Sequence, residues 1–201
     1  MSRKMIAILR GITPEEAVET TAAILDAGIT WIEVPLNSPE PLDSIARIAS
    51  ALKGRGHFGA GTVLSVKDVQ AVAAAGGDFI VSPNCNPEVI RASKAAGLGS
   101  YPGVYTPTEC FAALDAGADA LKIFPAELME PKGLKALKAV LPKDRDVLAV
   151  GGADPSNFAD WAAAGADGFG LGSFLYKPGR PAAEVGQRAA DCVAAYDAAY
   201  G

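Results

Sequence analysis

The sequence predicts an α/β protein folded as a single (β/α)8 barrel, and two observations lead to that class. Short apolar segments typical of strands buried on both faces recur eight times within 201 residues, which is about 25 residues per unit and close to the lower size limit of such barrels. Five of these segments directly follow an alanine-rich stretch that ends in Ala-Gly, as expected for a helix that ends at a left-handed glycine.

The strands can be placed in order along the chain. Residues 5–9 form the first, and Arg10-Gly11 then leads to Thr13, where a capping residue followed by proline and two glutamates predicts a helix start. The five strands preceded by Ala-Gly are residues 29–34, 77–83, 98–103, 118–125 and 166–173. Residues 58–63 and 147–150 complete the eight, and the alanine-rich residues 181–200 are predicted to form the closing helix.

A doubly wound open sheet is the alternative arrangement of alternating strands and helices. Its dinucleotide-binding form needs a GxGxxG turn after the first strand, whereas residues 10–16 read RGITPEE. The 22 glycines and 14 prolines are spread along the chain, so no segment resembles a linker. We therefore expect residues 1–201 to form one barrel domain.

Composition argues against several kinds of partner and site. The net charge is −5 and Lys and Arg are not clustered, which argues against nucleic-acid binding. The apolar run of residues 5–9 is too short for a signal peptide or a membrane span, so a cytoplasmic protein without membrane contact is expected. Cys85, Cys110 and Cys192 lack metal-ligand or disulfide spacing, and His57 is the single histidine. Neither a metal nor another cofactor is expected.

A barrel would gather the unusual polar residues of this chain at one end. The carboxyl ends of barrel strands, with the loops that follow them, carry the chemistry of such folds. The polar and glycine residues at those ends are Arg10, Glu33, Thr62, Ser82, Pro83, Asn84, Pro102, Gly103, Lys122, Gly151, Gly152, Gly172 and Ser173. Lys122 and Glu33 stand out because apolar residues flank both. We expect both side chains to point into the mouth of the barrel.

Lys122 and Glu33 form a candidate catalytic pair. Burial disfavours the ammonium form of lysine and lowers its pKa, and the neutral amine can then attack a carbonyl carbon to form a Schiff base. Burial raises the pKa of a glutamate, which can then exchange protons near neutral pH. The alternative is a structural ion pair between the two residues, which also tolerates burial.

Glycines at the ends of the last two strands predict a phosphate site. Residues 150–157 read VGGADPSN and residues 170–173 read GLGS. Backbone N–H groups at Gly151, Gly152 and Gly172 can surround a phosphate, with the Ser173 hydroxyl as a further donor, and phosphate commonly occupies this part of a barrel. Ordinary turn glycines are the alternative for each position taken alone.

The chain resembles the 2-keto-3-deoxy-6-phosphogluconate and 6-phosphogalactonate aldolases over nearly its whole length, through the segments AILRGITPEEA, IEVPLNSPEPLDSI, GAGTV, IVSPN, PGVYTPTE, ALKIFPAE, VGG and GFGLGS. The resemblance implies a class I aldolase on a (β/α)8 barrel, normally a homotrimer, that needs no metal. It implies that Lys122 forms the Schiff base and that Glu33 is the general acid/base. These two residues also stand out by their position in the predicted barrel.

The resemblance further implies where the substrate binds. It places Thr62 and Pro83 beside the substrate and puts the phosphate at the glycines and Ser173 described above. Gluconate-type enzymes bind the substrate carboxylate through an arginine of a segment that here begins at Asn37. In this chain an arginine stands instead at Arg10, similar to the galactonate type, and its guanidinium can hold a carboxylate through two hydrogen bonds. A surface ion pair is the alternative role for Arg10.

Three further residues complete the substrate-binding candidates. Val150 is similar to the galactonate type, because gluconate-type enzymes tend to carry threonine there. Asn37 follows the glutamate strand, and Phe124 is an aromatic residue of the core or of the barrel mouth. Small differences of this kind distinguish epimers only modestly.

The resemblance implies cleavage of 2-dehydro-3-deoxy-6-phosphogalactonate to pyruvate and D-glyceraldehyde 3-phosphate. The gluconate epimer, or both epimers, are the alternative substrates. An isomerase or synthase that uses the same phosphate loops without imine chemistry is a second alternative, and a non-catalytic phosphosugar-binding barrel is a third. Retention of both Lys122 and Glu33 disfavours the third.

Overall fold

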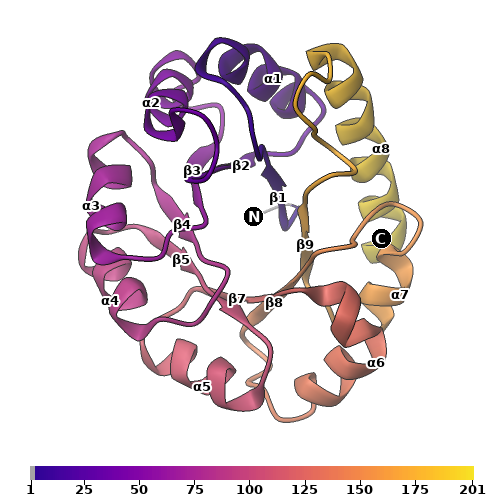
Figure 1. Ribbon diagram of the computed structural model, residues 1–201. Helices are drawn as coiled ribbons and strands as arrows, with labels where there is room; N and C mark the ends of the chain where they lie inside the picture. The colour runs from indigo at the N-terminus through magenta and orange to yellow at the C-terminus, as the bar shows by residue number, and fades with distance from the viewer. Residues whose placement is uncertain (1–2) are drawn as a thin grey trace.

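A ring of parallel strands lies inside a ring of helices in the computed structural model, which describes residues 3–201 (Figure 1). The strands are β1 (Met5–Ile8), β2 (Trp31–Pro35), β3 (His57–Gly61), β4 (Phe79–Val81), β5 (Gly99–Tyr101), β6 (Gly103–Val104), β7 (Ala120–Ile123), β8 (Asp146–Val150) and β9 (Gly168–Leu171). The helices are α1 (Pro14–Asp26), α2 (Pro41–Ala51), α3 (Val66–Ala74), α4 (Pro87–Ala95), α5 (Pro107–Asp115), α6 (Ala126–Lys138), α7 (Phe158–Ala163) and α8 (Ala182–Tyr200).

The predicted eight-stranded barrel is confirmed, with one strand divided in two. The strand order is β5-β4-β3-β2-β1-β9-β8-β7-β6 and every pairing is parallel. Pro102 separates β5 from β6, because proline has no N–H to donate to the ladder. The carbonyl of Pro102 still accepts a hydrogen bond from Lys122 N at 2.9 Å, so the chain passes through this residue and closes the ring.

The helix ends agree with the pattern read from the sequence. All five glycines of the Ala-Gly pairs have positive φ values, which glycine adopts without a steric penalty: Gly28, Gly76, Gly97, Gly117 and Gly165. At the start of α1, the N–H and hydroxyl of Thr13 both donate to the Glu16 carboxylate. Helix α6 is interrupted at Glu130, where φ is 59° and ψ is 162°. Pro131 follows, and a residue before proline is driven out of the helical conformation.

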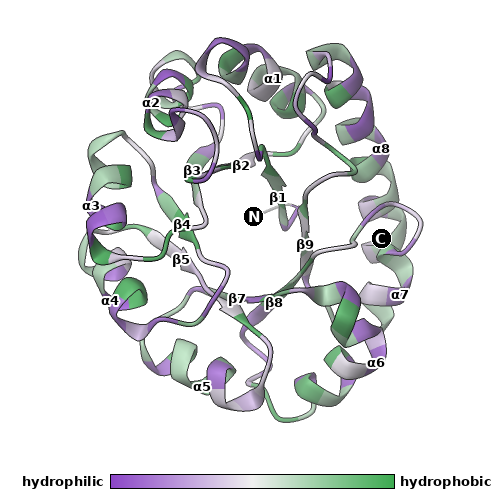
Figure 2. Ribbon diagram, viewed as in Figure 1, coloured by the Kyte–Doolittle hydropathy of each residue, from purple (hydrophilic) through white to green (hydrophobic). Residues whose placement is uncertain are grey.

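Apolar side chains fill the barrel interior. The inner cluster consists of Ile6, Ile8, Phe79, Val81, Tyr101, Ala120, Leu148 and Val150. Figure 2 shows hydrophobic residues along β1, β2 and β4 and hydrophilic residues mainly on the outer helices. Side chains alternate along a strand, so Lys122 points to the same side as Ala120. Its position in β7, between outward-facing Leu121 and Ile123, is what places an amine inside the barrel.

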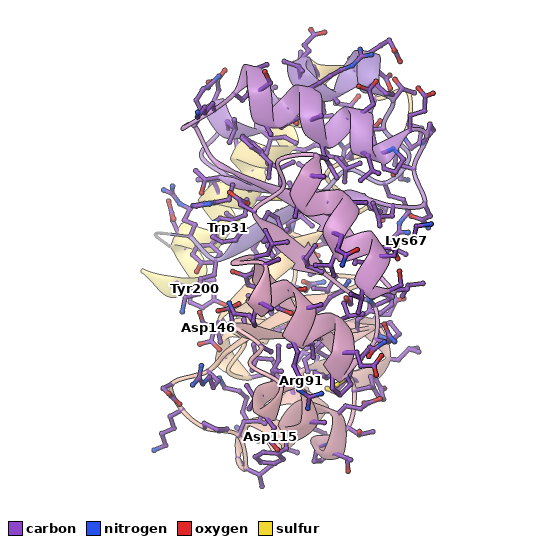
Figure 3. The ribbon with its side chains drawn as sticks, turned by 90° about the vertical axis from the view of Figure 1, so that its left-hand side faces the viewer. Trp31, Lys67, Arg91, Asp115, Asp146 and Tyr200 are labelled. Carbon is purple, nitrogen blue, oxygen red and sulfur yellow. The ribbon has the colours of Figure 1, made fainter. Side chains whose placement is uncertain are left out.

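The two ends of the barrel differ. Aromatic rings close the end where the strands begin: Trp31 lies 4.2 Å from the ring of His57, 5.0 Å from Phe79 and 5.6 Å from Tyr101, measured between ring centroids. Figure 3 shows Trp31 at this end and Lys67, on α3, at the opposite end. Within residues 3–201, none of the helices combines the length and the apolar character needed to span a membrane.

Candidate active site

A cavity of about 320 Å³ opens at the carboxyl end of the barrel strands. It lies beside β1, β7, β8 and β9 and the loops that follow them. Eight of the residues predicted from the sequence line it: Arg10, Lys122, Phe124, Val150, Gly151, Gly152, Gly172 and Ser173. A void of about 10 Å³ adjoins it in the barrel interior, and both Glu33 and Lys122 line this void.

Lys122 contacts both spaces. Its side chain is buried, with 6% of the residue exposed, and Nζ lies 4.7 Å from the centroid of the Phe124 ring. Burial lowers the pKa of this amine below the usual lysine value, and the nearby charge of Arg10 lowers it further, whereas Glu33 opposes the change. The neutral form of the amine, which is the nucleophile, is therefore reached at lower pH than in an exposed lysine.

Glu33 is the most deeply buried charged residue of the site, with 2% of the residue exposed. Its Oε2 atom has no hydrogen-bond partner within residues 3–201. Burial raises the pKa of this carboxyl to about 7, although Lys122 and Arg10 act in the opposite direction. A carboxyl with such a pKa is partly protonated at neutral pH and can both accept and donate a proton.

The ion-pair alternative for Lys122 and Glu33 does not fit the geometry. Across the described chain, the ion pairs with N···O distances up to 4.0 Å do not include these two residues. Both line the same small void, and a buried pair that stabilised the fold would need direct hydrogen bonds. The arrangement instead leaves an amine and a carboxyl that line one void and affect each other's pKa without forming a direct ion pair.

Gly61 provides the space that the Glu33 carboxylate occupies. A Cβ atom added at Gly61 would overlap Oε2 of Glu33 and come within 2.5 Å of its Cδ. The φ of Gly61 is not positive, so the side chain of Glu33, and not the backbone, requires a glycine here. Sequence analysis missed this residue. A glycine inside a strand does signal a close approach, but the sequence does not name the approaching group.

Arg10 and Asn37 lie together at the rim. Arg10 Nη1 donates to Asn37 Oδ1 at 3.1 Å, and the following residue, Gly11, donates its N–H to Ser38 Oγ at 2.9 Å. Within residues 3–201, Arg10 forms no ion pair with a carboxylate, so the surface ion-pair role does not apply. Its exposed guanidinium therefore remains able to bind an anion that enters the cavity.

The glycine loops after β8 and β9 face the cavity side by side, because these two strands are paired. Gly151 and Gly152 have φ values of 99° and 76°, which a residue with a side chain rarely adopts. Their backbone N–H groups, and that of Ser173, find no acceptor within the described chain. Free N–H groups that converge on one cavity are suited to bind a phosphate.

Four predicted residues lie outside the lining of the 320 Å³ cavity: Glu33, which lines the adjoining void, and Thr62, Pro83 and Asn37. Asn37 reaches the site through its bond to Arg10. Thr62 follows Gly61 with a φ of 56°, and the Pro83 carbonyl packs against Gly103 of β6. β3 and β4 lie on the far side of the ring from β8 and β9, so their ends meet another part of the mouth.

Eight residues that were not predicted line the same cavity: Ile8, Ala153, Asp154, Gly170, Phe174, Tyr176, Lys177 and Pro178. Lys177 is exposed and forms no ion pair within the described residues. It adds a second cation, besides Arg10, to a cavity that also contains the free N–H groups. The sequence signal was only its position four residues after Ser173, within the same loop.

Comparisons with known proteins all find similarity to aldolases of one family. Residues 1–185 match the family model described as KDPG and KHG aldolase. The chain is 51% identical over 201 residues to the probable 2-dehydro-3-deoxy-6-phosphogalactonate aldolase of Rhizobium meliloti (strain 1021), covering 100% of this chain and 95% of that protein. It is 50% identical to the 2-dehydro-3-deoxy-6-phosphogalactonate aldolase of Escherichia coli (strain K12), with coverage of 96% and 94%. The solved structure described as native KDPGal superposes with a TM-score of 0.98 at 48% identity, covering 100% of this chain and 97% of that chain.

Proposed function

The chain belongs to the KDPG and KHG aldolase family, and from that premise we propose that it is a class I aldolase that cleaves 2-dehydro-3-deoxy-6-phosphogalactonate to pyruvate and D-glyceraldehyde 3-phosphate. One observation carries the proposal. The buried amine of Lys122 and the buried carboxyl of Glu33 line one void at the floor of an open cavity, without forming an ion pair.

The reaction begins with Lys122. Its neutral amine attacks the C2 carbonyl of the substrate, a carbinolamine forms, and loss of water gives a protonated imine. The imine carries a positive charge and can accept the electron pair of a neighbouring bond. Apolar neighbours such as Ile8 and Val150 limit the water that could hydrolyse the imine early.

Glu33 then moves the proton on which cleavage depends. Its carboxylate accepts the proton of the C4 hydroxyl, the C4–O bond becomes a carbonyl, and the C3–C4 electron pair moves into the imine to form an enamine. Glyceraldehyde 3-phosphate leaves. The protonated Glu33 returns a proton to C3 of the enamine, and hydrolysis of the resulting imine releases pyruvate and the free amine.

The remaining groups hold the two charged ends of the substrate. We assign the phosphate to the N–H groups of Gly151, Gly152 and Ser173, with Gly172 in the same loop. Arg10 binds the carboxylate while Asn37 holds its guanidinium. The contacts of Thr62 and Pro83 with the substrate rest on the resemblance, whereas Phe124 is assigned to the substrate because it lines the cavity beside Lys122.

Reduction with sodium borohydride in the presence of pyruvate tests the proposal. Borohydride converts an imine into a stable secondary amine, so peptide mapping by mass spectrometry should find the pyruvate adduct on Lys122 and on no other lysine. An isomerase, a synthase or a phosphosugar-binding protein would form no adduct. An adduct on Lys177, which also lines the cavity, would contradict the assigned nucleophile.

Assembly and location are further parts of the proposal. The family resemblance supports a homotrimer, and sedimentation equilibrium measures this directly. A phosphorylated sugar acid does not cross membranes unaided, which supports a cytoplasmic enzyme. The family resemblance supports an enzyme that needs no metal or other cofactor. Full activity after dialysis against a chelator is the expected result, and a loss that a divalent metal restores would contradict it.

Val150 is proposed to favour the galactonate epimer. Its side chain lines the cavity and leaves 6% of the residue exposed, so a substrate hydroxyl beside it finds no hydrogen-bond partner there. In Val150→Thr we expect kcat/KM for the gluconate epimer to rise relative to the galactonate epimer by about 10-fold, since one added hydroxyl gives a modest discrimination. Initial rates with the two C4 epimers measure the ratio.

Val150→Ala is the matched control for this change. It removes the branched side chain without adding a hydroxyl, so the epimer ratio should stay near that of the wild-type enzyme. An equal change of the ratio in both variants would assign the preference to the shape of the cavity. A strict preference of the wild-type enzyme for the gluconate epimer would overturn the proposed substrate.

A further inference from the structure

The loop between β9 and α8, residues 172–181, forms one wall of the cavity. It contributes Gly172, Ser173, Phe174 and Lys177 to the lining. Much of the loop is exposed, including Ser173 and the three residues after Tyr176. A loop of this kind keeps one shape only if other groups hold its backbone.

Two consecutive carbonyls of the loop accept hydrogen bonds from one atom. Arg180 Nη1 donates to the carbonyl oxygens of Phe174 and of Leu175, each at 2.7 Å. Arg188 Nη1 donates to the Phe174 carbonyl as well, at 3.3 Å. Hydrogen bonds from a charged donor are stronger than those between neutral groups.

A shared carboxylate holds the two arginines in place. Glu184 Oε1 lies 3.3 Å from Arg180 Nε and 2.9 Å from Arg188 Nε. Only 11% of the Arg180 side chain is exposed, and the Arg188 guanidinium lies 5.3 Å from the centroid of the Phe174 ring. We call Arg180, Glu184 and Arg188 the arginine clamp. Two of the three belong to the first turns of α8, so the clamp ties the loop to a rigid helix.

The clamp fixes the side of the loop that faces away from the cavity. The Gly172 carbonyl accepts the N–H groups of Leu175 and Tyr176, which makes a tight turn of residues 172–176. The carbonyls at the end of this turn point to Arg180. The N–H groups of Ser173 and Phe174, at its beginning, have no acceptor within the described residues. Arg180 therefore provides hydrogen bonds for the carbonyls at the end of the turn, while the N–H groups at its beginning remain free to bind a ligand.

We propose that Arg180 is a positioning residue that sets the affinity of the enzyme for the phosphate of its substrate, an inference that rests on the proposed function. Arg180 does not line the cavity and acts through the loop backbone. Release of the loop would misalign the donors for the phosphate. It would leave Lys122 and Glu33, which lie on β7 and β2, where they are.

Arg180→Met tests the proposal, because methionine keeps an unbranched apolar stem and removes every donor. We expect KM for the phosphorylated substrate, and the inhibition constant of inorganic phosphate, to rise by about 10- to 100-fold, as expected for the loss of two charge-assisted hydrogen bonds. The rate of borohydride trapping with pyruvate, which has no phosphate, should stay within about twofold of wild type, since Lys122 is not displaced.

Two further variants separate positioning from general stability. Arg188→Met keeps both 2.7 Å bonds of Arg180 and should change the phosphate constants less. Arg180→Lys keeps the charge and should give an intermediate effect. These two remain informative if Arg180→Met does not fold.

The proposal is overturned if phosphate inhibition and pyruvate trapping weaken equally in the Arg180 variants. It is also overturned if the variants lose only thermal stability while the inhibition constant of phosphate is unchanged. In both cases a pyruvate adduct on Lys122 of the wild-type enzyme leaves the proposed aldolase function intact. Absence of that adduct would instead remove the proposed function itself.

Discussion

Lys122→Met is expected to lower kcat for aldol cleavage by on the order of 10⁴-fold or more, as for the loss of other nucleophiles that act as part of a unit. Without the amine no imine forms, and the electron pair of the C3–C4 bond then has no acceptor. Methionine is similar to lysine in length and suits the apolar surroundings. Pyruvate release measures turnover, and the borohydride adduct should be absent from the variant.

The same substitution should not destabilise the fold. Burial holds the pKa of Lys122 below its usual value of 10.5. Between pH 10.5 and the lower pKa of the folded state, the unfolded chain binds a proton that the folded chain takes up less readily. Stability therefore falls as the pH falls through this range, and the loss stays constant below it. Methionine removes that contribution. The melting temperature of Lys122→Met at neutral pH should equal or exceed that of wild type, so unfolding would not explain the lost activity.

Lys67→Met is the control for the loss of a lysine. Lys67 is exposed on α3 at the open end of the barrel, and it is not among the residues that line the cavity (Figure 3). Its replacement should leave both turnover and pyruvate trapping unchanged. The assignment of Lys122 would be wrong if Lys122→Met kept more than a tenth of the wild-type turnover.

Much of the barrel could be predicted because its signals are local. An Ala-Gly pair before an apolar run requires only the geometry of a helix end, and all five such glycines have positive φ values. The burial of Lys122 and Glu33 also follows from local information, since a strand buried on both faces leaves no solvent side for any of its residues. Pro102 divides one predicted strand into β5 and β6, but the ring of strands is closed as predicted.

The sequence could not predict in the same way which strand ends and loops lie next to each other at the mouth of the barrel. The sequence places Thr62 and Lys122 at the same level of the barrel, but it does not say which strand ends share one cavity. Lys177 and Arg180 lie in a loop without periodicity, where the sequence gives no direction for a side chain. The role of Gly61 depends on where the Glu33 side chain, on the neighbouring strand, extends.

Gly61→Ala should therefore lower kcat by about 10²-fold, because a reacting group displaced by about 1 Å loses that much. The added methyl group would overlap the Glu33 carboxylate, and the backbone of Gly61 can accept alanine without strain. The carboxylate is the part that must move. Steady-state cleavage rates measure the loss, and circular dichroism checks that the barrel has folded.

A double-mutant cycle tests whether the effect acts through Glu33. Glu33→Gln should itself lower kcat by about 10²- to 10⁴-fold, the usual contribution of a general acid/base. If Gly61 matters only because it leaves room for the carboxylate, Gly61→Ala should cost much less in the Glu33→Gln background than in wild type. Equal losses in both backgrounds would show that Gly61 acts on the fold and not on Glu33.

The pH dependence of kcat gives a further test, because Gly61→Ala should shift it in a defined direction. Glu33 must be ionised to accept the C4 hydroxyl proton, and burial raises its pKa to about 7, so wild-type kcat should increase between pH 6 and pH 8. A carboxylate that Gly61→Ala pushes towards the open cavity becomes better hydrated, and its pKa then falls towards the usual 4.5. The rise of kcat should move to lower pH although its maximum is smaller. A variant that keeps both the wild-type rate and the rise near pH 7 would show that the tight fit between Gly61 and Glu33 does not control the proton transfer.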